Sequence, residues 1–242
     1  MKYAIIAAGE GSRLAQEGIG VPKPLVTVGG EPLIDRLLRI FLANDATEVC
    51  VICNERMKEV GRHLEAIRDA GQLPLRLVVK STPSSMHSMW ELSPWLGDEP
   101  FILTTVDTIF REAEFADYVK AFRRMVDEGT ADGLMGVTDF VDDEKPLYVA
   151  VDEAMVITGF LDQCAPHSSP VTPHYVSGGI YGLTPLSLLT LQRAIERGES
   201  RMRNFQRALI ADGLRLRAWT FSKVLDIDHA SDIRQAEMFL AK

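Results

Sequence analysis

The sequence predicts an α/β fold with a mainly parallel sheet and helices on both of its faces. The chain has 242 residues, 46% of them apolar and 25% charged, which is typical of a globular protein. In the first half, short apolar and β-branched runs alternate with segments whose apolar residues recur at helical spacing. Such alternation implies right-handed crossovers between parallel strands. The length suits one large domain or two small ones.

The first half contains four predicted strands and three predicted helices. One apolar run opens directly into a glycine-rich loop, and another ends at Asp107. Ligands of such sheets bind at the carboxyl ends of the strands, so the loop after Ala8 and Asp107 are expected at one sheet edge. In chain order the strands are 3–7, 50–53, 75–79 and 101–106, and the helices are 33–42, 57–67 and 115–126.

The second half is less regular and contains more strands. Its loop from Cys164 to His174, with three prolines and paired serines, has the composition of an irregular connection. The predicted strands are 134–138, 147–151, 155–160, 175–183 and 214–221, and the predicted helices are 186–197, 203–211 and 232–240.

Charge and composition exclude several classes of protein. The chain carries 34 acidic and 26 basic side chains, a formal net charge of −8, which disfavours a general nucleic-acid binder. No stretch approaches ~18 uninterrupted apolar residues, so no membrane span is expected. The N-terminal apolar run is short and lacks a cleavage site, so a cytoplasmic location is expected.

The cysteines do not form a disulfide framework or a metal site. Cys50 and Cys53 have the C-x-x-C spacing of redox and metal sites, but they lie in a predicted strand. Side chains three positions apart on a strand point to opposite faces, so the pair cannot hold one ion. We therefore expect two buried thiols.

The segment that carries chemistry is the glycine-rich loop after the first strand. Its glycines let the backbone approach an anion closely, and successive N–H groups can surround a phosphate. Ser12 adds a hydroxyl, Arg13 a planar cation and Lys23 a point-like positive charge. The loop reads Ala7-Ala8-Gly9-Glu10-Gly11-Ser12-Arg13-Leu14 and is followed by Pro22-Lys23-Pro24-Leu25.

Two well-known phosphate-binding motifs do not match this loop. A dinucleotide fingerprint needs a third glycine where Leu14 stands, and a ribose-binding acid ~20 residues past the loop, whereas Glu55 is ~40 residues away. A Walker loop needs Gly-Lys-Ser or Gly-Lys-Thr, which is absent. A tight turn with solvated charges would explain any one element alone, but not the whole combination.

Together these motifs resemble the signature of the nucleotidyltransferases that activate sugar-1-phosphates. The segment Gly29-Gly30-Glu31-Pro32-Leu33-Ile34 resembles the Gly-x-Pro-Leu-Ile that follows the signature in that family. The resemblance implies a Rossmann-like, mostly parallel (mixed) sheet of the nucleotide-diphospho-sugar transferase type. It also implies one domain, 1–242, with a nucleotide-binding half, 1–130, and an acceptor-binding half, 131–242.

The resemblance implies a role for each matching position. The predicted nucleotide-binding residues are Ala7, Ala8, Gly9, Gly11, Ser12, Arg13, Lys23 and Ser85, with Arg13, Lys23 and Asp107 as the catalytic group. Asp107 and Asp226 are the expected Mg²⁺ ligands, and Asp226 matches the second acidic motif better than Asp228. The acceptor is expected to contact Ser177, Gly178 and Gly179, in a segment that resembles the family's Gly-Ile-Tyr strand.

The implied activity is Mg²⁺-dependent transfer of a nucleoside monophosphate from a triphosphate to a phosphorylated small molecule, with release of pyrophosphate. A sugar-1-phosphate is the expected acceptor. The stretch 81–90 departs from the family's Gly-Thr-Ala turn and is closer to cytidylyltransferases that act on phosphocholine. A phosphocholine acceptor and a catalytically silent nucleotide-binding domain are the alternatives; the nucleobase and the oligomeric state are not predicted.

Single residues also have simpler structural interpretations. Asp107 could be a helix N-cap, and Asp226 and Asp228 could be turn residues ahead of a helix capped by Ser231. Gly178 and Gly179 could form a bulge.

Overall fold

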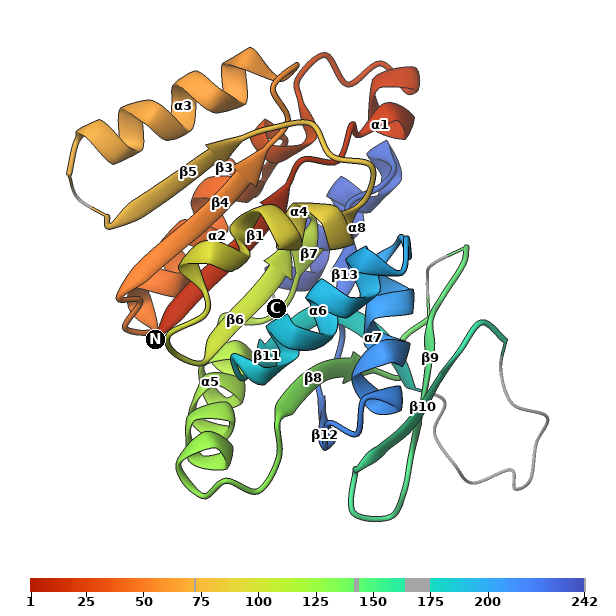
Figure 1. Cartoon of the computed structure of the whole chain (residues 1–242). Coiled ribbons are helices and arrows are strands. Elements are labelled where there is room, and N and C mark those ends of the chain that lie inside the picture. The colour runs from red at the N-terminus through yellow and green to blue at the C-terminus, as the bar shows by residue number, and fades with distance from the viewer. Residues whose placement is uncertain (72, 142–143, 164–174, 242) are drawn as a thin grey trace.

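The computed structural model describes residues 1–71, 73–141, 144–163 and 175–241 (Figure 1). Within them, a nine-stranded mixed sheet has the order β10-β9-β11-β6-β1-β4-β5, with β8 paired to β11 and β12 to β8. Helices cover both faces, as the sequence predicted. No helix in the described part of the chain is long and apolar enough to cross a membrane.

The parallel part of the sheet comes from the first half of the chain. Here β1 lies between β4 and β6, and β5 is at the edge beyond β4. The register pairs Ala7 with Cys53 and Ile6 with Thr105, so three carboxyl ends meet at one edge. The strands are β1 (Lys2–Ala7), β4 (Glu48–Cys53), β5 (Leu75–Val79) and β6 (Phe101–Thr105); the helices are α1 (Ser12–Gln16), α2 (Leu33–Ala43), α3 (Lys58–Asp69), α4 (Ser85–Leu92) and α5 (Glu112–Asp127).

The second half adds the antiparallel part through its longest strand, β11 (Tyr175–Leu183). This strand pairs antiparallel with β6, β8 and β9. The remaining elements are β8 (Gly133–Thr138), β9 (Tyr148–Val151), β10 (Ile157–Leu161), α6 (Leu186–Glu196), α7 (Met202–Ala211), β12 (Leu216–Thr220) and α8 (Ala230–Leu240). The register of β11 against β8 shifts between Ser177 and Ile180, so Gly178 and Gly179 do form a bulge.

The structure contains short elements that the sequence analysis did not predict, and one pair of them joins the two halves. The strand β7 (Thr108–Ile109), directly after Asp107, pairs antiparallel with β13 (Leu225–Asp226). This pairing brings residues 107 and 226 to one place although they are far apart in the chain. A second small sheet joins β2 (Thr27–Val28) and β3 (Glu31–Pro32), and the 3₁₀ turns are η1 (Lys23–Leu25) and η2 (Ser93–Trp95).

Apolar side chains form one core on each face of the sheet. Alternate residues of β1 divide between them: Tyr3 and Ile5 lie in one core, Ala4 and Ile6 in the other. Cys53 and Cys50 divide in the same way, which confirms the prediction that they face opposite sides. Burial raises the pKa of Cys50 to about 12 and of Cys53 to about 11, so both thiols stay protonated at neutral pH.

Gly182→Ala is expected to lower the free energy of unfolding by about 1–3 kcal/mol. A methyl group at Gly182, in β11, would come within 2.7 Å of the Phe122 ring and 2.8 Å of the Tyr118 hydroxyl. Both rings are fully buried, and the Tyr118 hydroxyl donates to the carbonyl of Leu134, so neither can move easily. Denaturation in urea measures the effect. Gly159→Ala in β10 is the matched control, because the nearest atom to its added methyl group is Cβ of Ala150, 3.9 Å away. Equal free energies of unfolding for the two variants would contradict the packing argument.

Candidate active site

The glycine-rich loop connects β1 to the short helix α1. Gly11, which precedes α1, has φ +60°, a conformation that glycine adopts without strain. The backbone N–H groups of residues 9–13 have no hydrogen-bond partner within the described chain. Ser12 and Arg13 are exposed beside them. The loop therefore presents successive N–H groups, a hydroxyl and a guanidinium to solvent, as a phosphate site requires.

A close contact between Gly11 and Lys23 joins the loop to the Pro-Lys-Pro segment. A methyl group at Gly11 would lie 2.9 Å from Cβ of Lys23, so glycine is what lets the two segments meet. Lys23 is the first residue of η1 and is only 8% exposed. A lysine this buried needs anionic partners.

Asp107 and Asp228 are those partners. Lys23 Nζ donates to Oδ2 of Asp107 at 2.5 Å and to Oδ1 of Asp228 at 2.7 Å. Burial alone would lower the pKa of Lys23, but the two carboxylates outweigh it and hold the pKa above its ordinary value. Burial alone would raise the pKa of Asp107, but Lys23 outweighs it and lowers that pKa. The Lys23 ammonium and the Asp107 carboxylate therefore stay charged at neutral pH.

Asp107 lies just past the end of β6, as the sequence predicted, and it is not a helix cap. The next helix, α5, begins five residues later and has Arg111 at its N-cap position, so the N-cap interpretation was wrong. Oδ1 of Asp107 is buried and has no hydrogen-bond partner among the residues that the structure describes. One oxygen of this carboxylate therefore binds Lys23, and the other is left for another ligand.

The C-terminal acidic segment is fixed beside Asp107. Asp226 pairs with Thr108 in the small β7–β13 sheet, and the N–H of Ile227 donates to the carbonyl of Asp107 at 3.1 Å. The carboxylate of Asp232 accepts from the N–H groups of Asp228 and His229. His229, rather than the predicted Ser231, is the N-cap residue of α8. Asp226 therefore lies in the small β7–β13 sheet, whereas Asp228 lies beside the start of α8.

Asp107 and Asp226 line one pocket of about 300 Å³. The unpartnered Oδ1 of Asp107 and a second carboxylate are a donor set that suits Mg²⁺, which prefers one or two carboxylates plus phosphate oxygens and waters. No group of three or more metal-binding side chains occurs in the described ranges, so the protein alone offers no complete cage. The residues fit a Mg²⁺ ion that a phosphate would help to coordinate.

The same pocket contains the predicted acceptor residues Ser177 and Gly179, and Ser85 of α4. The buried side chain of Gln206 joins α7 to β11, accepting from Ser177 and donating to Tyr181. Burial, with a contribution from Asp226 and Asp107, raises the pKa of Tyr181 to about 12. Tyr181 is the one aromatic side chain among the described lining residues, and the cations there are Lys145, Arg201 and Arg203.

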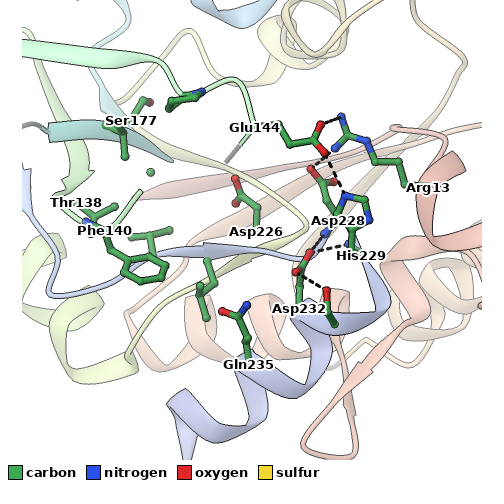
Figure 2. Close-up of a pocket in the computed structure, with 16 residues that line it drawn as sticks. Arg13, Thr138, Phe140, Glu144, Ser177, Asp226, Asp228, His229, Asp232 and Gln235 are labelled. Atoms are coloured by element: carbon green, nitrogen blue, oxygen red, sulfur yellow. Dashed lines mark hydrogen bonds and ion pairs between the residues drawn. The ribbon is translucent and has the colours of Figure 1, made fainter. Parts of the chain in front are cut away.

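A second pocket, also of about 300 Å³, adjoins Asp226 as well (Figure 2). Ser177 and Asp226 line both pockets, whereas Gly178 lines only this one and Gly179 only the first. Arg13 lies at its edge, 2.8 Å from Asp228 and 3.7 Å from Glu144. Asp228 therefore contacts both Arg13 and Lys23.

Two residues of the site were not in the predicted set. Asp228 was considered only as a weaker metal ligand or a turn residue, yet it joins Arg13 to Lys23. Asn54, 4% exposed, donates to the carbonyl of Ala8 at 3.1 Å and accepts from Ser81 at 2.8 Å. Its position directly after β4, at the carboxyl edge of the sheet, is a signal that could have identified it.

Gly11→Ala is expected to reduce turnover about 10-fold or more. Alanine is strained at φ +60°, and its methyl group would push Lys23 away from the carboxylates. Steady-state kinetics measures the loss. Gly20→Ala is the control in the same connection, because nothing lies within 4 Å of its added methyl group and its φ is not positive. Activity of the Gly11 variant equal to that of the control would show that the close contact with Lys23 is unimportant.

The fold and this group of residues define an α/β protein whose sheet has, at its carboxyl edge, a group of residues suited to phosphate ligands. Residues 3–172 match the family model described as the MobA-like NTP transferase domain, and the chain belongs to that family.

Curated relatives support the family assignment over parts of the chain. A glucose-1-phosphate cytidylyltransferase of Salmonella typhimurium is 34% identical over 53 residues, which are 22% of this chain and 21% of that protein. A mannose-1-phosphate guanyltransferase of Kluyveromyces lactis is 23% identical over 189 residues, 76% of this chain and 50% of that protein. The chain thus spans between a fifth and a half of the length of these relatives.

Solved structures match almost the whole chain. One is assigned to a glucose-1-phosphate thymidylyltransferase from Bacillus anthracis, with TM-score 0.81, 20% identity, and coverage of 99% of this chain and 94% of that one. Another is the inositol-1-phosphate CTP transferase from T. maritima, with TM-score 0.76, 18% identity, and coverage of 100% and 98%. At such identities the likeness shows the fold, and it confirms the predicted nucleotide-diphospho-sugar transferase type.

Proposed function

We propose that the protein transfers a nucleoside monophosphate from a nucleoside triphosphate to a phosphorylated small molecule and releases pyrophosphate, with Mg²⁺ as its cofactor. The observation that carries this proposal is the position of Lys23. Its Nζ lies 2.5 Å from Oδ2 of Asp107, and its segment packs against the loop of residues 9–13, whose backbone N–H groups have no hydrogen-bond partner in the described chain. The site thus has a cation, a carboxylate and phosphate-binding N–H groups next to one another. Membership of the NTP transferase family supports the same reaction class.

In the proposed mechanism, each group of the chain has a separate task. The amides of residues 9–13, Ser12 and Arg13 bind the triphosphate, and Ser85 contacts the nucleoside. Lys23 bridges the α-phosphate and the incoming phosphate, and it stabilises the charge that builds up between them. Asp107 and Asp226 would hold Mg²⁺, which would neutralise further phosphate charge. No covalent enzyme intermediate is required, because the acceptor phosphate itself attacks the α-phosphorus.

A sugar-1-phosphate or a similar polyol phosphate is the proposed acceptor. Ser177, Gly179 and Gln206 give the pocket small and hydrogen-bonding groups that suit a hydroxyl-rich ligand. Phosphocholine needs an aromatic cage, whereas the described lining residues include one aromatic ring, and three cations stand beside the two carboxylates. The names of the relatives, which include glucose-1-phosphate, mannose-1-phosphate and inositol-1-phosphate enzymes, support this class of acceptor.

Pyrophosphate release across a panel of nucleotides and acceptors tests the proposal. The panel combines the common nucleoside triphosphates with hexose-1-phosphates, inositol-1-phosphate and phosphocholine, with and without Mg²⁺. We expect release with at least one sugar or polyol phosphate and only with the divalent ion. Turnover with phosphocholine alone would overturn the acceptor class. Tight nucleotide binding without pyrophosphate release from any pair would favour a catalytically silent domain.

A further inference from the structure

The backbone at Arg201 has an unusual conformation for an L-amino acid. Arg201 directly precedes α7 and has φ +74° and ψ 140°. Non-glycine residues with positive φ normally adopt the left-handed helical region, in which ψ is roughly +30° to +60°. Arg201 lies outside that region, so its conformation must be held by its surroundings. Strain of this kind concentrates at functional sites.

A hydrogen bond from the other half of the chain holds this backbone. The N–H of Arg201 donates to Oγ of Ser84 at 3.3 Å. Ser84 directly precedes α4, and its Oγ lies 2.9 Å from Nδ1 of His87. Since Oγ accepts from Arg201, the hydroxyl proton can be donated to His87, and both partners are satisfied. Ser84 thus connects the helix that begins with Ser85 to the helix that follows Arg201.

Hydrogen bonds at the start of α7 also fix the backbone of Arg201. Its carbonyl accepts from the N–H of Asn204 at 3.1 Å, and the Asn204 side chain donates to the carbonyl of Ser200 at 2.7 Å. The turn into α7 is therefore held on one side by Asn204 and on the other by Ser84. Removing the Ser84 hydroxyl would leave the Arg201 N–H without its hydrogen bond to the residue that precedes α4.

Arg201 lines the pocket that contains Ser177 and Gly179, called the acceptor pocket below, together with Asp107 and Asp226. Arg203, which lines the same pocket, is 2.6 Å from Asp162 and so has a carboxylate partner. In the part of the chain that the structure describes, the Arg201 guanidinium has no ion pair or hydrogen bond. An arginine without a carboxylate partner in this pocket is suited to an anionic ligand.

We infer that Arg201 binds the phosphate of the acceptor and that Ser84 is a positioning residue, which holds the strained Arg201 backbone so that the guanidinium faces the acceptor pocket. The inference deepens the proposed function and rests on it. It assigns the acceptor site a residue outside the predicted set, and it assigns Ser84 a role exerted through a backbone N–H of the opposite half.

Kinetics with the accepted substrates provides the first test. Arg201→Ala is expected to raise the KM of the acceptor about 10-fold or more, because a charge-assisted contact is lost, with little change in the KM of the nucleotide. Arg193→Ala is the control: this arginine of α6 is exposed and contacts Asp212, outside the pocket. Ser84→Ala is expected to raise the acceptor KM about 3-fold or more, and Ser84→Thr, which keeps the hydroxyl, to restore it.

A double variant separates positioning from a general structural effect. If Ser84 acts through Arg201, adding Ser84→Ala to Arg201→Ala leaves the acceptor KM nearly unchanged. A full additional loss in the double variant would overturn the positioning role. An equal rise in nucleotide and acceptor KM for Arg201→Ala would overturn the assignment of Arg201 to the acceptor.

A stability comparison tests the strained backbone without any substrate. Arg201→Gly and Arg201→Ala both remove the guanidinium, but only glycine adopts positive φ easily, so the glycine variant should melt at the higher temperature. The difference should shrink when Ser84→Ala is added, because the backbone can then relax. Equal melting temperatures for the glycine and alanine variants would overturn the inference.

Failure of the proposed function would be recognised separately, as absence of turnover with every acceptor. In that case, binding of inorganic phosphate measured by calorimetry decides the role of Arg201. Weaker binding by Arg201→Ala than by Arg193→Ala supports it, and equal binding overturns it.

Discussion

Replacing Asp107 with asparagine is expected to lower Mg²⁺-supported turnover about 10²-fold or more, while the fold is kept. One oxygen of Asp107 accepts from Lys23 at 2.5 Å, and the other is buried without a hydrogen-bond partner in the described part of the chain. The amide has the same shape, but it removes the negative charge that attracts a divalent cation and balances Lys23. Steady-state turnover and the Mg²⁺ concentration at half-maximal rate are the measurements.

Asp117→Asn is the matched control for this variant. Asp117 lies on the exposed face of α5 and pairs with Lys120 across 2.9 Å, so its replacement should leave turnover and thermal stability unchanged. Thermal denaturation of the Asp107 variant checks that the fold is intact. Near-normal turnover of a folded Asp107→Asn protein would refute the metal-binding role of this carboxylate.

Lys23→Ala is expected to lower kcat about 10²- to 10³-fold and to weaken nucleotide binding much less. Arg13 and the amides of residues 9–13 still contact the triphosphate in this variant, whereas the charge that develops at the α-phosphorus loses its partner. Rapid-mixing measurement of the chemical step and calorimetry of nucleotide binding separate the two effects. Lys120→Ala, an exposed lysine of α5, is the control.

The same substitution is expected to change the pH dependence of the residual activity. In the native protein, burial raises the pKa of Asp107, but the Lys23 ammonium outweighs it and lowers that pKa. Without the ammonium the influence of burial remains, so the pKa of Asp107 rises and the acidic limb of the pH–rate profile moves to higher pH. Equal losses in nucleotide affinity and turnover, with an unchanged acidic limb, would mean that Lys23 only anchors the nucleotide.

Periodicity and strand order predicted the part of the site that local sequence determines. The Gly-rich loop after β1 and Asp107 after β6 were expected at one edge, because parallel neighbouring strands bring their carboxyl ends together, and the register confirms this. The bulge at Gly178 and Gly179 could also be anticipated, since adjacent glycines in a strand are typical of bulges.

Contacts between distant segments could not be predicted from the sequence. Asp228 contacts Lys23 and Arg13 across more than 200 residues, through a two-residue strand too short to give a periodic signal. The separation of Gly178 from Gly179, which line different pockets, depends on the bulge geometry. The division into nucleotide and acceptor halves at residue 130 stays a prediction.

The ion pairs around Asp228 have a consequence for the way an anion approaches. Arg13 and Lys23 contact Asp107, Asp228 and Glu144, so each of the two cations already has carboxylate partners. A bare triphosphate must compete with these carboxylates for both cations, whereas a divalent ion at Asp107 would draw part of that negative charge away. We therefore expect the protein to bind metal-complexed nucleotide more tightly than the uncomplexed anion.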